Sequence, residues 1–164
     1  MKKYLGGALA SAVAATLYVV IAELLGLTQY SWIAFITWCV FFFKGASPEA
    51  SVKSAPGIVY GAVIAWIVLE ANVILDTGLF LYGAITFVMA FIVMMSMANK
   101  WLDDASVTFI GVNLVFGSGS LLWSIVFGLV GLFILEPLWA WLADKSNNLL
   151  RIFFPPFSLV CTEE

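Results

Sequence analysis

Three glutamates lie within or at the ends of long apolar runs. They are Glu23, Glu70 and Glu136. An ionised side chain there raises the free energy of the protein in a bilayer and can mark a functional site. An acid at the centre of a bilayer is strongly unfavourable, and much less so near the interface. Glu70 and Glu136 fall toward opposite ends of the predicted membrane layer, which predicts one acid at each mouth of a central path. The alternative interpretation is that both are interfacial acids that reach lipid headgroups.

Uncharged polar residues occupy two short apolar runs. Thr37 and Trp38 lie in the run 32–43, and Thr108 and Asn113 lie in the run 107–116. An asparagine amide both donates and accepts hydrogen bonds, as a filter for a neutral amide or a hydrated ion requires. We therefore predict that these four residues line a solute path. The alternative role for each is a single interhelical hydrogen bond worth about 1 kcal/mol.

Residue types that support catalysis are missing from the apolar runs. The chain has no histidine, no phosphate-cradling glycine motif, no metal-ligand spacing, and no Ser/Lys or paired-Asp arrangement within the runs. We therefore expect no enzyme activity, no catalytic residues, no metal site, no cofactor and no nucleic-acid partner. No Lys or Arg lies inside a run either, which favours a neutral or cationic solute over an anion.

The elements that must position these residues are membrane spans. Of the 164 residues, 63% are hydrophobic and 10% are charged, a composition that excludes a water-soluble core wrapped in polar surface. The lipid bilayer is therefore the expected solvent. The predicted spans are residues 4–27, 32–43, 57–75, 79–97, 107–116 and 121–143.

All seven basic residues fall on one side of the membrane when the runs are counted as six spans. Cytoplasmic loops are enriched in Lys and Arg, so this distribution predicts that both termini are cytoplasmic. The loops after the first, third and fifth runs contain no Lys or Arg. The basic residues are Lys2, Lys3, Lys44, Lys53, Lys100, Lys145 and Arg151.

The second and fifth runs, at 12 and 10 residues, are shorter than the roughly 20 helical residues that a bilayer requires. We therefore expect interrupted segments there. Their matching places indicate an internal repeat of three spans, and an odd number of spans inverts the second repeat relative to the first. The predicted fold is an all-α integral membrane protein with a single domain over residues 1–143, repeats at 4–75 and 79–143, and a cytoplasmic tail at 144–164. The aligned segments are 5–8 with 81–84, 31–35 with 106–109, and 58–61 with 125–128.

Two stretches carry a resemblance to a known family. Residues 31–39 continuing through 60–66, and Thr108-Phe109-Ile110-Gly111 with Phe116-Gly117 after it, resemble a bacterial inner-membrane family of unknown function typified by YcdZ. The likeness covers roughly residues 5–143. Where that family has Pro-Gly ahead of Thr-Phe-Ile-Gly, this chain has Ala105-Ser106-Val107. The resemblance implies six spans in the bacterial cytoplasmic membrane, and it implies no substrate or catalytic residue.

These observations favour a channel or facilitator for a small polar solute, either a neutral molecule of urea or amide size or a small cation. So few ionisable groups lie within the spans that a passive path is the simpler mechanism. The small size of the chain favours a homo-oligomer. The competing hypothesis is a non-transporting membrane assembly or regulatory subunit whose glycine-rich faces, or whose tail, bind a partner protein.

Overall fold

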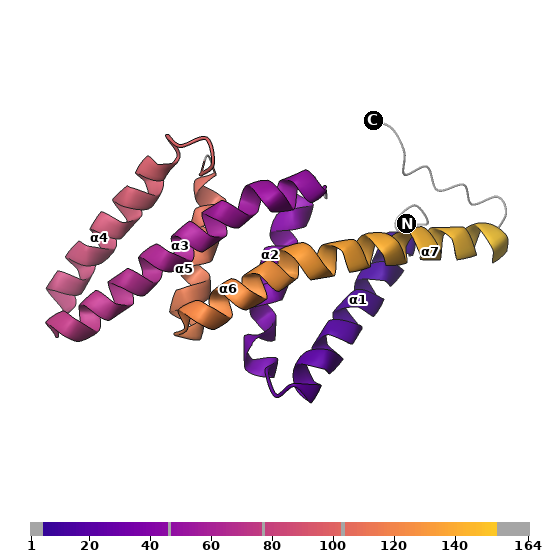
Figure 1. Ribbon diagram of the computed structural model, residues 1–164, viewed down its shortest axis with the longest axis horizontal. Coiled ribbons are helices and arrows are strands. Elements are labelled where there is room, and N and C mark those ends of the chain that lie inside the picture. Colours follow the sequence, from indigo (N-terminus) through magenta and orange to yellow (C-terminus); the bar gives the residue numbers. More distant parts are fainter. Residues whose placement is uncertain (1–4, 46, 77, 103, 154–164) are drawn as a thin grey trace. The chain divides into compact units, whose positions relative to one another are not determined.

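The structure is a computed structural model that describes residues 5–45, 47–76, 78–102 and 104–153. Over these residues the chain consists of helices joined by short turns, with no strand (Figure 1). The predicted all-α class is confirmed. The elements are α1 (Leu5–Leu24), the 3₁₀ turn η2 (Thr28–Tyr30), α2 (Ser31–Phe43), α3 (Pro48–Leu75), α4 (Leu79–Ser96), α5 (Ala105–Ser118), α6 (Leu121–Val130), the π-helical turn η3 (Gly131–Leu135) and α7 (Glu136–Phe153).

Three helical stretches are long and apolar enough to cross a membrane, by length and composition. They are Gly6–Leu24, Pro48–Leu75 and Leu121–Ser146, the last formed by α6, η3 and most of α7. Shorter apolar helices cover Thr28–Phe43, Phe80–Ser96 and Ala105–Ser118. Each of the six predicted runs therefore contains a helix, and the long, short, long order of helix lengths occurs as predicted in the first half of the chain.

The helix α3 begins nine residues earlier than predicted, at Pro48 rather than Gly57. The Ser47 side chain accepts a hydrogen bond from the Ala50 N–H at 3.2 Å, and Pro48 and Glu49 occupy the first turn. This is a strong helix start, because proline needs no N–H donor there and an acid favours the positive end of the helix dipole. At the other end of the chain, α7 continues past Ala143 to Phe153, so the first part of the predicted tail is helical. The rest of that tail, residues 154–164, lies outside the described residues.

The two short segments are uninterrupted, and our prediction of a break within them is wrong. The helices α2 and α5 are continuous α-helices of 13 and 14 residues. The sequence of α2 contains no glycine or proline, and Gly111 inside α5 faces another helix. Irregular backbone lies at their ends instead, at Gly45 and Gly119, which both have positive φ.

Contacts divide the chain into two compact units, which we describe separately. The terminal unit comprises residues 1–28 and 133–164, and the central unit comprises residues 29–132. The units divide the chain differently from the predicted repeats, because the boundary between the repeats lies inside the central unit. All four predicted pathway residues and Glu70 belong to the central unit, whereas Glu136 belongs to the terminal unit.

In the central unit, α3 packs against both α4 and the crossing helix α5, and α4 and α5 also contact each other (Figure 1). A hydrophobic core joins these three helices, and partly buried residues of α6 pack against it. The core residues are Ala62, Ala65 and Val68 of α3, Met89 and Val93 of α4, and Val112 and Val115 of α5. Small residues predominate on α3, so the helices approach closely.

The contact between α3 and α5 brings backbone against backbone. A Cβ atom added at Gly61 would lie 2.0 Å from the Thr108 carbonyl oxygen, and one added at Gly111 would lie 2.1 Å from the Ile58 carbonyl oxygen. Glycine is therefore required on both sides of this crossing. A similar contact holds α2, because a Cβ at Gly131 would lie 2.3 Å from the Ala34 carbonyl oxygen.

In the terminal unit, hydrogen bonds hold α1 and α7 together in antiparallel directions. The Trp139 indole N–H donates to the Ser11 hydroxyl at 2.9 Å and also approaches the Gly7 carbonyl oxygen at 3.4 Å. The Ser146 hydroxyl donates to the Gly6 carbonyl oxygen at 2.9 Å. Small residues on α1 therefore expose backbone acceptors that side chains of α7 reach.

Candidate functional site

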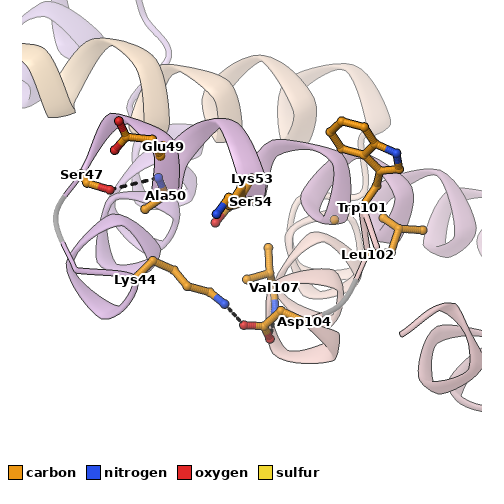
Figure 2. Close-up of a pocket in the computed structure, with 11 residues that line it drawn as sticks. Lys44, Ser47, Glu49, Ala50, Lys53, Ser54, Trp101, Leu102, Asp104 and Val107 are labelled. Atoms are coloured by element: carbon orange, nitrogen blue, oxygen red, sulfur yellow. Dashed lines mark hydrogen bonds and ion pairs between the residues drawn. The ribbon is translucent and has the colours of Figure 1, made fainter. Parts of the chain in front are cut away.

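The clearest polar pocket lies in the central unit, where the end of α2 and the beginnings of α3 and α5 meet (Figure 2). We call it the Lys-Asp pocket. Its volume of about 250 Å³ has room for roughly eight water molecules at about 30 Å³ each. Its lining residues are Lys44, Ser47, Glu49, Ala50, Lys53, Ser54, Gly57, Trp101, Leu102, Asp104 and Val107.

Helix starts and ends position these side chains. Lys44 is the residue at the C-terminal end of α2, and Ser47 caps the start of α3. Lys53 and Ser54 follow within the first two turns of α3. Asp104 caps α5, since its Oδ1 accepts hydrogen bonds from the Ser106 N–H at 2.8 Å and the Val107 N–H at 3.3 Å. The pocket therefore combines segments from both predicted repeats.

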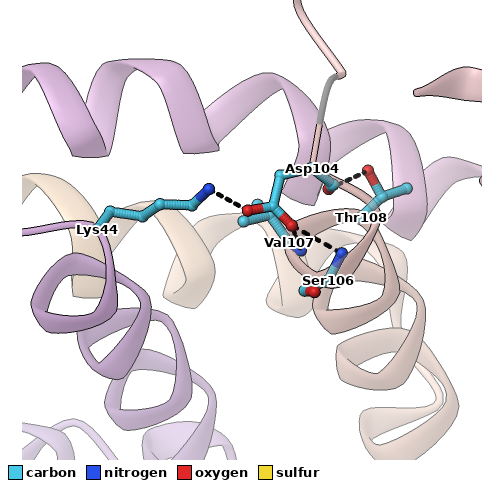
Figure 3. A network of polar contacts seen from close by, with 5 residues as sticks. All are labelled: Lys44, Asp104, Ser106, Val107 and Thr108. Atoms are coloured by element: carbon cyan, nitrogen blue, oxygen red, sulfur yellow. Dashed lines mark hydrogen bonds and ion pairs between the residues drawn. The ribbon is translucent and has the colours of Figure 1, made fainter. Parts of the chain in front are cut away.

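An ion pair joins the two sides of the pocket. The Lys44 ammonium group donates to Asp104 Oδ2, and the same carboxylate holds the first turn of α5 through its other oxygen (Figure 3). The Thr108 hydroxyl donates to the Asp104 carbonyl oxygen at 3.3 Å. The carboxylate thus links the end of α2 to the start of α5.

The charges that line the pocket balance. Its described lining residues include two cations, Lys44 and Lys53, and two anions, Glu49 and Asp104. Lys53 makes no ion pair with any described residue. A site with balanced charge and nearby hydroxyls gives no net attraction to an anion or a cation, but it offers both donors and acceptors. Such a lining suits a neutral, dipolar molecule.

The ion pair predicts a small pH dependence of stability. The hydrogen bond from Lys44 lowers the pKa of Asp104 below its usual value, with a contribution from the backbone N–H groups. A lowered pKa stabilises the folded chain above about pH 4, and this contribution is lost as the pH falls through the lowered value. Because both side chains are partly exposed, we expect Lys44→Met to remove at most about 1 kcal/mol at neutral pH.

Thermal unfolding of Lys44→Met in detergent between pH 3 and pH 7 checks this prediction. The variant should lose part of the acid-dependent stability that the wild type shows. Lys53→Met is the matched control, because it removes a cation of the same pocket that has no ion pair among the described residues. Equal pH profiles for the two variants would contradict the role of the ion pair.

The two predicted pathway threonines are buried and used in packing. Thr37 and Thr108 are both 0% exposed. The Thr37 hydroxyl donates to the Ala34 carbonyl oxygen at 3.1 Å within its own helix, as Thr108 does to Asp104. Thr37 also lies at the close approach of α2 to Gly131. Neither residue belongs to the lining of the Lys-Asp pocket.

The other two predicted pathway residues differ from each other. Trp38 is only 6% exposed, and its buried indole N–H has no hydrogen-bond partner among the described residues. Its ring contacts Phe35 and Phe42 of the same helix. Asn113 lies on the exposed side of α5. The structure therefore does not bring the four predicted pathway residues into the Lys-Asp pocket.

The two predicted mouth residues belong to different units. Glu70 is exposed near the end of α3 and lines an open groove with Asp76 of the α3–α4 turn, Tyr82 of α4 and Gly119 of the α5–α6 turn. Glu136 begins α7 in the terminal unit and is 6% exposed. Asp76 and Gly119 bring two turns of the central unit to the Glu70 groove. Lys44, Ser47 and Asp104 bring the other two turns to the Lys-Asp pocket. Successive turns of the central unit therefore alternate between the Lys-Asp pocket and the Glu70 groove.

The lining residues of the Lys-Asp pocket were not among the predicted site residues. From the sequence, Lys44 and Lys53 predict only the topology, and residues 44–56 lie between the predicted spans 32–43 and 57–75. The signals for this region were helix starts: Ser47-Pro48-Glu49 ahead of α3, and Asp104 ahead of α5. Both are typical first-turn patterns.

Comparisons with known proteins show the family. Residues 5–146 match the family described as "Protein of unknown function (DUF1097)". No curated protein and no solved structure matches the chain. The matched range includes every predicted site residue and the complete lining of the Lys-Asp pocket. Since the match covers most of the 164 residues, the chain belongs to the DUF1097 family of proteins of unknown function.

Proposed function

We propose that the protein is a membrane facilitator for a small, neutral polar solute of urea or amide size, and that the Lys-Asp pocket is the cytoplasmic entrance of its path. The observation that carries this proposal is the composition of the pocket. Two cations, two anions and the hydroxyls of Ser47 and Ser54 line a space of about 250 Å³, which is large enough for several water molecules. A dipolar solute can replace its hydrogen bonds to water with hydrogen bonds to these groups. Because the solute is neutral, no net charge moves with it.

The pocket is the wider part of the proposed path, and the α3–α5 crossing is its closed gate. Gly57 and Val107 line the pocket, and Gly61, one turn after Gly57 in α3, makes the backbone contact with Thr108, the residue after Val107 in α5. Passage of a solute then requires α3 and α5 to separate at this contact. Thr108 is part of the gate itself, so the solute would meet its hydroxyl when the gate opens, and Thr108 retains its predicted role in the path in this proposal.

Charge distribution supports the orientation. Lys44 and Lys53 line the pocket, and the turn at residues 100–102 lies at the same end. Because cytoplasmic loops are enriched in basic residues, these lysines support a cytoplasmic position for this end of the central unit and, with the other basic residues, for both termini. The resemblance to the YcdZ-type family favours the bacterial inner membrane. The inverted repeat, with its two short helices α2 and α5, remains part of this proposal.

A non-transporting assembly or regulatory subunit is the second candidate. The backbone contact between Gly61 and Thr108 favours it, because a permanently closed crossing would serve packing alone. The two functions differ in a measurable property, since only a facilitator changes the permeability of a membrane that contains no other protein.

Vesicle re-swelling tests the proposal directly. Purified protein is reconstituted into liposomes, which are then shrunk in hyperosmotic urea, acetamide, glycerol or glucose. We expect re-swelling in urea and acetamide to be faster than in protein-free liposomes, and re-swelling in glucose to be unchanged. An ammonium gradient tests the cation alternative separately. Equal rates with and without protein for every solute would remove the facilitator and favour the subunit.

A further inference from the structure

A long apolar groove lies between α3 and α4 in the central unit. The two helices run side by side in opposite directions (Figure 1). The groove has a volume of about 470 Å³, and it extends from Ile64 to Ala71 on α3 and from Leu81 to Ile92 on α4. Every described residue that lines it has an aliphatic or methionine side chain. Such a lining suits a hydrocarbon chain and offers no hydrogen bond to a water-soluble compound.

The length of the groove matches one leaflet of a bilayer. The distance from Leu81 to Ile92 along α4 is about 17 Å at about 1.5 Å per residue. A hydrocarbon layer is roughly 30 Å thick, so one leaflet supplies about half of that thickness. One acyl chain of a single leaflet therefore fits along the groove from end to end.

A polar hollow follows the groove at the end where α4 finishes. Tyr60 lies four residues before Ile64 on α3, and Ser96 lies four residues after Ile92 on α4. A separation of four residues keeps each pair on the same face of its helix. Tyr60 and Ser96 line the hollow together with residues 98–100 of the turn after α4. The groove and the hollow therefore succeed each other on the same faces of the helix pair.

The hollow offers hydrogen-bond donors and a positive charge, and its described lining contains no acid. Lys100 makes no ion pair with any described residue, and its ammonium group lies 5.4 Å from the centre of the Trp101 ring. The side-chain oxygen of Asn99 accepts a hydrogen bond from the Trp101 N–H at 3.0 Å, which leaves the Asn99 N–H₂ group as a donor. The turn at the other end of the groove carries an acid, Asp76. The two ends of the groove therefore differ in charge, and only the Lys100 end attracts an anion.

We propose that the groove and the hollow together bind one anionic phospholipid, with an acyl chain between α3 and α4 and the phosphate beside Lys100. The ammonium group of Lys100, the Asn99 N–H₂ group and the Tyr60 hydroxyl are the donors that phosphate oxygens accept from. Basic residues at the cytoplasmic ends of membrane helices favour anionic headgroups. A zwitterionic lipid with a choline group would bring a second cation close to Lys100, which disfavours it.

This inference rests on the membrane location in the proposed function, and it does not depend on transport. The basic residues that predict the topology place Lys100 on the cytoplasmic side. The lipid then belongs to the cytoplasmic leaflet.

Native mass spectrometry of the full chain in a neutral detergent tests the headgroup contact, because it counts bound lipid molecules. The protein is titrated with phosphatidylglycerol or with phosphatidylcholine that has the same acyl chains. We expect the first phosphatidylglycerol to bind about fivefold more tightly than phosphatidylcholine, and Lys100→Gln to lose most of this preference. Lys145→Gln is the matched control, and it should keep the preference. The Lys145 ammonium group also lies over a tryptophan ring, Trp141 at 5.6 Å, but it lines neither the groove nor the hollow.

Ala84→Phe tests the groove. Ala84 is exposed and lines the groove, so a phenyl group there can fill part of the space without displacing a buried side chain. We expect the affinity for both lipids to fall about fivefold or more, because the acyl chain loses its packing against the helices. Gly83→Phe is the control, since an added Cβ atom there meets nothing within 4 Å and Gly83 does not line the groove. Its lipid affinity should equal that of the wild type, and circular dichroism shows whether each variant folds.

Three results would overturn the proposal. They are equal affinities of the wild type for the two lipids, an undiminished preference in Lys100→Gln, and wild-type lipid affinity in folded Ala84→Phe. Glycerol phosphate, a headgroup without acyl chains, should not displace phosphatidylglycerol at an equal concentration, and displacement would contradict a role for the groove. Each readout is lipid binding in detergent, so it stands whatever the re-swelling assay shows.

Discussion

Gly61→Ala is expected to lower the free energy of unfolding by about 3 kcal/mol, although it adds one methyl group. That methyl carbon would lie 2.0 Å from the Thr108 carbonyl oxygen and 3.0 Å from the Val112 nitrogen. Ordinary contact begins at 3.4 Å, so α3 and α5 would have to separate by more than 1 Å. Both neighbouring atoms are backbone, so no rotamer change relieves the overlap. Unfolding in detergent, followed by circular dichroism, measures the loss.

Gly83→Ala is the matched control for this substitution. Gly83 also lies inside a helix, α4, but a Cβ atom there would meet nothing within 4 Å. Because alanine has the higher helix propensity, this variant should be as stable as the wild type or up to about 1 kcal/mol more stable. Equal stability of the Gly61 and Gly83 variants would mean that α3 and α5 are further apart than described.

Ser54→Leu is expected to abolish solute-dependent re-swelling, to the rate of protein-free liposomes, if the Lys-Asp pocket is the entrance to a path. Ser54 is 3% exposed and lines the pocket from α3. A leucine there would fill part of the 250 Å³ space with apolar side chain and would remove a hydroxyl. A polar solute would then have to give up its water without a replacement hydrogen bond.

Ser54→Ala separates occlusion from loss of the hydroxyl. Alanine leaves the pocket open, so flux should stay closer to that of wild type than to that of Ser54→Leu. Unfolding of both variants in detergent shows whether each one folds. A folded Ser54→Leu with undiminished flux would exclude the Lys-Asp pocket as the entrance, even if wild-type protein transports urea.

Helix class and helix order follow from hydrophobicity, which is why all six apolar runs contain a helix near the predicted place. The errors concern the helix ends and the breaks that we predicted within α2 and α5. The start of α3 depends on Ser47 and Pro48, a local capping pattern that a hydropathy profile does not weigh, so the predicted span begins only at Gly57. The continuity of α2 depends on its contacts with Gly128 and Gly131, because close packing against these glycines stabilises a helix that is short.

The predicted site residues show how much of a site can be predicted from the sequence pattern alone. Thr37, Thr108 and Trp38 were predicted to line a solute path, and the structure places all three among the buried residues. Whether a buried hydroxyl faces a cavity or its own helix depends on side-chain rotation and on neighbouring helices. The exposure of Asn113 could not be predicted from the sequence either, because it depends on which face of α5 packs against α3.

The shortness of α2 and α5 has a consequence for biogenesis. Helices of 13 and 14 residues span about 20 Å, less than the roughly 30 Å of a hydrocarbon layer, so neither is a good substrate for independent insertion. For α5 the stabilising neighbour α3 has already been synthesised when α5 leaves the ribosome. For α2 the closest partner is the segment around Gly128 and Gly131, which is made near the end of translation. We therefore expect α2 to settle in the membrane only after α6 has been translated, late in the assembly of the chain.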